Sequence, residues 1–108
     1  MNFEVLRKAN VERDKEWSEG EVKFTPLFRA TELAGEVGEA CNVVKKLERE
    51  AMGLRGSRSS KISLATELAD VIICADLLAM EYGIDLAAAV RVKFNSTSID
   101  RGLKTRIE

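Results

Sequence analysis

The sequence predicts an all-α fold, with a single domain that spans residues 1–108. Three observations support this prediction. Apolar residues recur at helical spacing in four segments, and the only proline, Pro26, stands where a helix can begin. No segment shows the apolar–polar alternation of a β-strand, and no internal repeat is present. A chain of 108 residues also has room for only one domain.

The first two helices are predicted over residues 3–17 and 26–50. Gly20 and the residues that follow it interrupt the first helical pattern. Thr25 is placed to cap the second helix, because its side-chain oxygen can accept a hydrogen bond from a free backbone N–H. Pro26 then occupies the first helical position, where a missing N–H costs nothing.

The third and fourth helices follow a loop rich in glycine and serine at residues 52–60. Ser59 or Ser60 is expected to cap a third helix that runs to about residue 82, where Gly83 provides a C-terminal signal. Asp85 is expected to cap a fourth helix that ends near residue 95. The tail, residues 96–108, shows no clear periodicity.

The third helix is apolar on nearly every side between Leu68 and Met80. A helix of this kind is buried on all sides, and a monomer of 108 residues can hardly surround it. We therefore expect this helix to lie at the centre of a homo-oligomer, a dimer or a tetramer.

Composition excludes several classes of protein. The net charge of −1 and the scattered basic residues argue against nucleic-acid binding. The longest apolar run, residues 71–80, contains Asp76 and is about half the length needed to span a bilayer. With no signal peptide at the N-terminus, a cytoplasmic protein without membrane contact is expected. Cys41 and Cys74 fall on apolar stripes, which predicts buried free thiols in a reducing compartment.

The chain contains no histidine. It therefore cannot build a Glu-x-x-His di-iron site, most zinc sites or a catalytic triad from its own residues. Carboxylates remain as ligands for a metal, and they favour hard cations such as Mg²⁺ or Mn²⁺.

Acidic residues occur in two groups at helical spacing. Glu32, Glu36 and Glu39 share one face of the second helix, and Glu67 and Asp70 share a face of the apolar third helix. Burying unpaired carboxylates among apolar residues destabilises a fold, unless a cation compensates their charge. Two such groups on adjacent antiparallel helices would face each other and offer oxygen ligands to Mg²⁺. The alternatives are a solvated surface for the first group and, for the second, a salt bridge to Lys45 or Lys46.

The two groups resemble the signature of the MazG-like, all-α nucleotide pyrophosphatase superfamily, which is Glu-x-x-Glu followed after a spacer by Glu-x-x-Asp. The matching stretches read ELAGEVGEACNVVKKL, ATELADVIICADLLAMEYGIDL and AVRVKFN, and they cover about residues 26–95. Two features depart from the family pattern. Gly35 precedes Glu36 at a position where many relatives have a glutamate. Many relatives also have an arginine shortly after the asparagine, whereas Arg101 in this chain lies six residues beyond Asn95.

The resemblance implies a four-helix MazG-like bundle completed by oligomerisation, of the small stand-alone bacterial or phage type. It also implies Mg²⁺-dependent hydrolysis of (deoxy)nucleoside triphosphates to the monophosphate and pyrophosphate, with a possible role in cleansing the nucleotide pool. Mn²⁺ is a possible substitute metal. The metal ligands would be Glu36, Glu39, Glu67 and Asp70, and either Glu36 or Glu39 would act as general base.

Substrate contacts are predicted at residues outside the carboxylate groups. The family pattern points to Lys93 and Asn95 for the phosphates and to Trp17 for the base, with Asn42 as a further polar candidate. Lys46, about two turns beyond Glu39, is placed to reach the phosphates. Further candidate cations for the phosphates are Lys45, Arg55, Arg58 and Lys61.

A different class of function also fits the sequence. The chain could be a non-catalytic helical module that assembles into a bundle, with its carboxylates engaged in salt bridges or holding a structural ion. Turnover of a nucleoside triphosphate with Mg²⁺ or Mn²⁺ would distinguish the enzyme from such a module.

Overall fold

The computed structural model describes all 108 residues and contains four α-helices and no β-strand, which confirms the predicted all-α class. The helices are α1 (Phe3–Ser18), α2 (Pro26–Ala51), α3 (Lys61–Glu81) and α4 (Leu86–Asp100). None of them is long and apolar enough to cross a membrane.

Each helix begins at a side chain that caps it. Thr25, Ser60 and Asp85 each accept a hydrogen bond from the backbone N–H three residues later, as predicted. Asn2 does the same for α1, a cap that the sequence pattern did not reveal. Caps of this type stabilise a helix by about 1 kcal/mol each, so the helix starts are fixed locally.

The end of α4 differs from the prediction, because the helix continues to Asp100 rather than ending near residue 95. The extra turn gains support from the tail, which folds back along it. The Asn95 side chain donates to the Ile107 carbonyl at 2.8 Å and accepts from the Ile107 N–H at 2.7 Å. The Leu103 N–H also donates to the Ser98 carbonyl at 2.8 Å. Long-range hydrogen bonds therefore outweigh the weak helical propensity of this segment.

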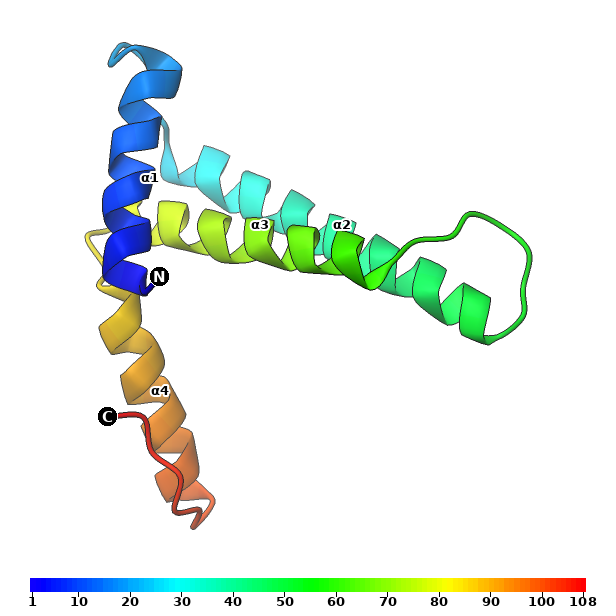
Figure 1. Cartoon of the computed structure of the whole chain (residues 1–108). Helices are drawn as coiled ribbons and strands as arrows, with labels where there is room; N and C mark the ends of the chain where they lie inside the picture. The colour runs from blue at the N-terminus through cyan, green and yellow to red at the C-terminus, as the bar shows by residue number, and fades with distance from the viewer.

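The helices are arranged as a long hairpin with a crosspiece at one end (Figure 1). Helices α2 and α3 pack antiparallel along the hairpin, and α1 lies across the end of α3. Helix α4 leaves the same end and extends away from the hairpin, roughly in line with α1. The chain thus consists of an α2–α3 hairpin and two arms, α1 and α4.

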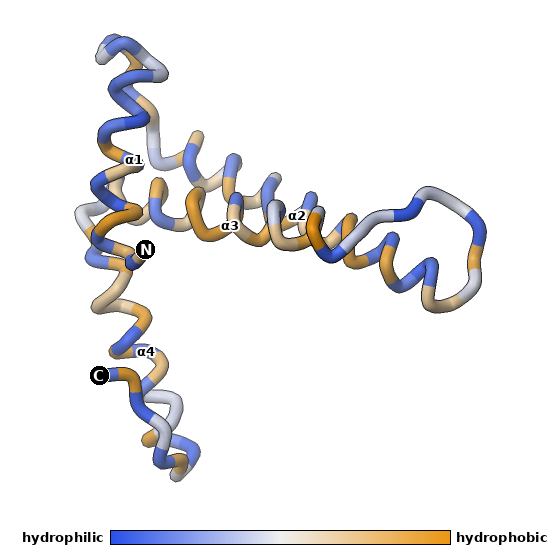
Figure 2. The backbone as a smooth tube through the Cα atoms, viewed as in Figure 1, coloured by the Kyte–Doolittle hydropathy of each residue, from blue (hydrophilic) through white to orange (hydrophobic).

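This arrangement is much more open than an ordinary domain. The radius of gyration is 17.3 Å, compared with about 13 Å for a compact chain of this length. Only 9 of 108 residues are buried, and many large apolar side chains on α2, α3 and α4 are exposed. Figure 2 shows where apolar residues occur along these helices. The four helices therefore do not close into a bundle within one chain.

The two cysteines differ in environment. Cys74 is buried, as predicted, and burial raises the pKa of its thiol to about 11. Cys41 is exposed, so the prediction of a buried thiol was wrong for this residue in the single chain. The reason is that the side of α2 that carries Cys41 does not face α3. The neighbouring residues Ala40 and Val43, on another side of the helix, are buried.

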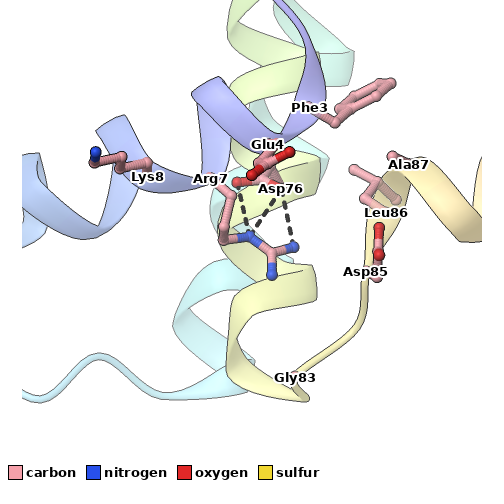
Figure 3. A pocket seen from close by; sticks show the side chains of 9 residues that line it. All are labelled: Phe3, Glu4, Arg7, Lys8, Asp76, Gly83, Asp85, Leu86 and Ala87. Carbon is pink, nitrogen blue, oxygen red and sulfur yellow. Dashed lines mark hydrogen bonds and ion pairs between the residues drawn. The ribbon is translucent and has the colours of Figure 1, made fainter.

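A buried ion pair fixes α1 across α3. The Asp76 carboxylate is only 1 % exposed and accepts hydrogen bonds from Arg7 at 3.1 and 3.2 Å and from Asn10 at 3.0 Å. Arg7 also donates to the Ile84 carbonyl at 2.7 Å, which links α1 to the turn before α4. Figure 3 shows the Arg7 guanidinium facing Asp76 beside a pocket between α1 and α4. One carboxylate thus sets the position of both arms.

Candidate metal centre

The antiparallel packing of α2 and α3 brings the two acidic motifs together. One carboxylate oxygen each of Glu36, Glu67 and Asp70 lies within 4.8 Å of the others. All three side chains are half-buried in the hairpin. The two motifs therefore face each other across the helices, as their spacing predicts. We call Glu36, Glu67 and Asp70 the carboxylate cluster.

The carboxylate cluster forms no ion pair within the chain. The four ion pairs involve Asp14, Glu32, Asp76 and Glu81, and none involves the cluster. The alternative of a salt bridge to Lys45 or Lys46 is thus not realised. Glu36 and Glu67 each have one Oε2 atom that is shielded from solvent and has no hydrogen-bond partner.

These unpartnered oxygens bear directly on whether a cation fits the site. A shielded carboxylate oxygen without a donor is costly, and a hard divalent ion removes that cost by binding it. Mg²⁺ is usually bound through one or two carboxylates and keeps several of its waters, and the cluster offers enough carboxylate oxygens for this. The residues present therefore fit a magnesium ion.

Burial and the repulsion between carboxylates both raise the pKa values of Glu36 and Glu67. Burial raises the pKa of Glu36, and the negative charges of Glu39, Asp70 and Glu67 raise it further. Burial likewise raises the pKa of Glu67, followed by contact with Glu39 and the charges of Glu39 and Asp70. Glu39 itself is exposed and lies at the edge of the cluster. It is the member of the predicted set with the most access to water.

We predict that the metal-free protein loses thermal stability as the pH rises. The folded-state pKa values of Glu36 and Glu67 are above the ordinary value of 4.5. Folding therefore favours the protonated form, and this contribution is present at low pH and lost as pH rises through the raised pKa values. Thermal melts without divalent cations, from pH 4.5 upward, should show it as a falling Tm.

The matched variants for this prediction are Glu36→Gln and Glu67→Gln, which keep the shape and remove the charge. Both should flatten the dependence of Tm on pH, whereas Glu48→Gln, an exposed glutamate on the same α2 helix as Glu36, should leave it unchanged. Adding Mg²⁺ at neutral pH should raise the Tm of the wild type and of Glu48→Gln, but not the Tm of Glu36→Gln or Glu67→Gln. A wild-type Tm that does not depend on pH in this range would show that the cluster carries no net repulsion.

An aromatic pocket lies next to the carboxylate cluster. Its volume is about 420 Å³, and Trp17, Phe24, Phe28 and Arg29 line it together with Glu32. Glu32 is one helical turn before Glu36 on α2, about 6 Å along the axis. Trp17 stands at the rim with 77 % of its surface exposed. The predicted base-binding residue Trp17 thus lines the same pocket as Glu32, which is one helical turn from Glu36.

Arg29 holds this pocket in shape. It is 2 % exposed and forms ion pairs with Asp14, with Glu81 at 3.4 Å and with Glu32 at 3.6 Å. Its guanidinium lies over the Phe24 ring, 4.1 Å from the centroid. Because its charge is already shared among three carboxylates, Arg29 is a structural cation and is not free for a phosphate.

The predicted phosphate contacts are not assembled within one chain. Lys46 is half-buried on α2, two turns beyond Glu39, and forms no ion pair. Lys93 is exposed on α4, which extends away from the hairpin (Figure 1). Both polar atoms of the Asn95 side chain are occupied by Ile107. The predicted cations on the helices that carry the cluster are Lys45 and Lys46 on α2 and Lys61 at the start of α3.

Some residues around the site were missed by sequence reasoning. Phe24, Phe28 and Arg29 shape the aromatic pocket, and none was predicted. A signal was present for Arg29, which lies four residues before Leu33 and eleven before Ala40, on the side of α2 that faces α3. A charged residue on such an inward face needs a partner, which is a reason to look for acidic residues on neighbouring helices.

Comparison of the chain with known protein families, with curated proteins and with solved structures gives no match.

Proposed function

We propose that the protein is a Mg²⁺-dependent nucleoside-triphosphate pyrophosphohydrolase of the MazG-like type. The observation that carries the proposal is the pair of shielded, unpartnered oxygens on Glu36 and Glu67, in a cluster that has no cation of its own. Carboxylates placed in this way are costly for the fold, so a role in binding a cation accounts for them. The reaction class comes from the resemblance of the Glu36/Glu39 and Glu67/Asp70 motifs to the MazG-like signature.

In this proposal, Glu36, Glu67 and Asp70 hold the metal. Bound Mg²⁺ supplies charge neutralisation for the triphosphate and lowers the pKa of water. Glu39 lies beside the cluster but is exposed, so its carboxylate is the better placed of the two candidates to accept a proton from an attacking water.

The aromatic pocket is the proposed site for the nucleobase. Trp17, Phe24 and Phe28 offer flat apolar surfaces for stacking, and Arg13 lies 5.7 Å from the centroid of the Trp17 ring. Glu32 lines this pocket one turn before Glu36, so in this proposal a base in the pocket directs its sugar and phosphates toward the cluster. This placement supports a nucleotide as substrate over a bare polyphosphate.

The phosphates need cations that the hairpin alone does not bring to the cluster. Lys46 is one, and Lys93 and Asn95 on α4 are proposed to act in a homo-oligomer, a dimer or a tetramer, in which α4 meets another chain. For Asn95 this requires the tail to release its amide from Ile107. A cytoplasmic location remains a prediction.

We expect pyrophosphate release when the protein is incubated with a panel of ribo- and deoxynucleoside triphosphates and Mg²⁺. Chromatography should show the monophosphate as the nucleotide product, because attack at the α-phosphorus leaves pyrophosphate intact. Release of inorganic phosphate together with the nucleoside diphosphate would instead indicate attack at the γ-phosphorus. No turnover of any nucleotide with Mg²⁺ or Mn²⁺ would refute the proposal.

The runner-up is a non-catalytic helical module, and the openness of the chain favours it. A radius of gyration of 17.3 Å and outward-facing apolar residues are what an assembly unit requires. In that case the carboxylate cluster would bind a structural ion, and EDTA would change the size of the assembly. The nucleotide panel separates the two functions.

A further inference from the structure

The C-terminal tail, residues 101–108, folds back on α4. The chain reverses its direction at Gly102, which has a positive φ of 66°. In Figure 1 the tail, drawn in red, returns along α4, and the C-terminus lies beside the helix. The last residues of the chain are therefore next to the part of α4 that carries Asn95.

The tail is attached to α4 by hydrogen bonds more than by apolar packing. All eight of its residues are exposed, including Leu103 at 56 % and Ile107 at 39 %. Three hydrogen bonds join residues 103–108 to the helix. One runs from the Leu103 N–H to the Ser98 carbonyl at 2.8 Å, and the other two join Ile107 to Asn95. The end of the tail can therefore leave the helix without exposing the core.

The two bonds at Asn95 engage a side chain of the proposed phosphate site. Its Nδ2 atom donates to the Ile107 carbonyl at 2.8 Å, and its Oδ1 atom accepts from the Ile107 N–H at 2.7 Å. Both are good lengths for hydrogen bonds of this type. The backbone of one residue thus satisfies both ends of the amide, and a substrate oxygen that approaches Asn95 has to compete with it.

We propose that residues 107–108 are an autoinhibitory latch, which closes on Asn95 in the free protein and is displaced from α4 by a bound nucleoside triphosphate. The latch rests on the proposed function, because it takes Asn95 as a substrate contact. Its place in the chain suits it to this role, since it is the free end and buries no side chain. The bond between Leu103 and Ser98 does not involve Asn95, so it stays when the latch opens.

The number of bonds sets the size of the effect. Two neutral hydrogen bonds of ordinary strength favour the closed state over the open one by roughly 5–150-fold. A ligand that requires the open state binds more weakly in proportion to the fraction of molecules that are open. The latch therefore raises KM and leaves kcat unchanged, because Asn95 is equally available once the substrate is bound.

Removal of Ile107 and Glu108 opens the latch permanently. The chain that ends at Arg106 keeps the bond from Leu103 to Ser98, and its KM for a nucleoside triphosphate should be lower than that of the full chain by at least about 5-fold, with the same kcat. Ile107→Pro removes only the N–H donor and should give an intermediate KM. Glu108→Gln is the matched control, because it leaves the Ile107 backbone in place, and it should keep the wild-type KM.

Hydrogen exchange measured by NMR tests the latch in the unmodified chain. The Ile107 amide should exchange slowly in the free protein, since its N–H is bonded to Asn95. It should exchange several times faster when the protein is saturated with Mg²⁺ and a triphosphate analogue in which a methylene group replaces the oxygen between the α- and β-phosphorus. The Leu103 amide is the internal reference and should keep its protection.

The outcomes separate the latch from the proposed function. A KM of the chain ending at Arg106 that equals or exceeds that of the full chain would overturn the latch and leave the pyrophosphatase standing. Protection of the Ile107 amide that persists with the bound analogue would also overturn the latch. If neither chain hydrolyses any nucleoside triphosphate and neither binds the analogue, the proposed function fails, and the latch fails with it.

Discussion

Replacement of Asp76 with alanine is expected to destabilise the protein by about 3–5 kcal/mol, the range for breaking a buried ion pair from one side. Asp76 is 1 % exposed and is the acceptor for both Arg7 and Asn10. Its removal leaves Asn10, which is 2 % exposed, without this bond, and leaves the Arg7 charge without a counter-ion. Chemical denaturation monitored by circular dichroism should show the loss as a lower midpoint.

The control variants separate the ion pair from the general effect of a mutation. Asp100→Ala removes an exposed carboxylate at the end of α4 that forms no ion pair, and it should change stability by less than about 0.5 kcal/mol. The double variant Arg7→Met with Asp76→Leu replaces the charges by apolar groups of similar length and should recover much of the loss. If Asp76→Ala unfolds at the same denaturant concentration as the wild type, the ion pair does not hold α1 in place.

The sequence predicts the helices well because their boundaries depend on local chemistry. Thr25, Ser60 and Asp85 cap the helices where their side chains meet free backbone N–H groups, and Gly83 adopts a positive φ of 62° after α3. Each of these devices acts within about four residues, which is the range that a sequence pattern describes. The end of α4 was misjudged because its support comes from Ile107, twelve residues away from Asn95.

Part of the carboxylate cluster could also be predicted. The motifs Glu36/Glu39 and Glu67/Asp70 each occupy one helix face. A single loop at residues 52–60 joins α2 to α3, so we expected antiparallel neighbours whose acidic motifs meet. Which oxygens approach could not be predicted, because this depends on the register between the helices. The structure brings Glu36, Glu67 and Asp70 within 4.8 Å of one another and leaves Glu39 at the edge.

The positions of the two arms, α1 and α4, could not be predicted from sequence patterns. The contact between Arg7 and Asp76 joins residues 69 positions apart, and no periodicity relates them. In the sequence, Asp76 appears only as an interruption of an apolar run. The direction of α4 is equally non-local, because it follows from the turn at residues 82–85 and from the bond between Arg7 and the Ile84 carbonyl. Lys93 is therefore carried away from the cluster of its own chain.

Glu67→Gln and Asp70→Asn are each expected to reduce turnover of nucleoside triphosphates by at least about 100-fold, if the proposed function is correct. Each substitution keeps the size of the side chain and removes one anionic oxygen ligand, and the loss of a single group that stabilises the reacting phosphates has effects of this order. Initial rates of pyrophosphate release at saturating Mg²⁺ measure the effect. Glu48→Gln, an exposed glutamate without an ion pair, should keep the wild-type rate.

The stability of the same variants shows whether lost activity comes from the site or from unfolding. Burial and the charges of Glu39 and Asp70 raise the pKa of Glu67, so the ionised cluster opposes folding when no metal is bound. Glu67→Gln should therefore melt at a higher temperature than the wild type at neutral pH without Mg²⁺, while being nearly inactive with it. A variant that loses activity and stability together would indicate a structural role for the carboxylate. Full activity in either variant would remove that residue from the metal centre.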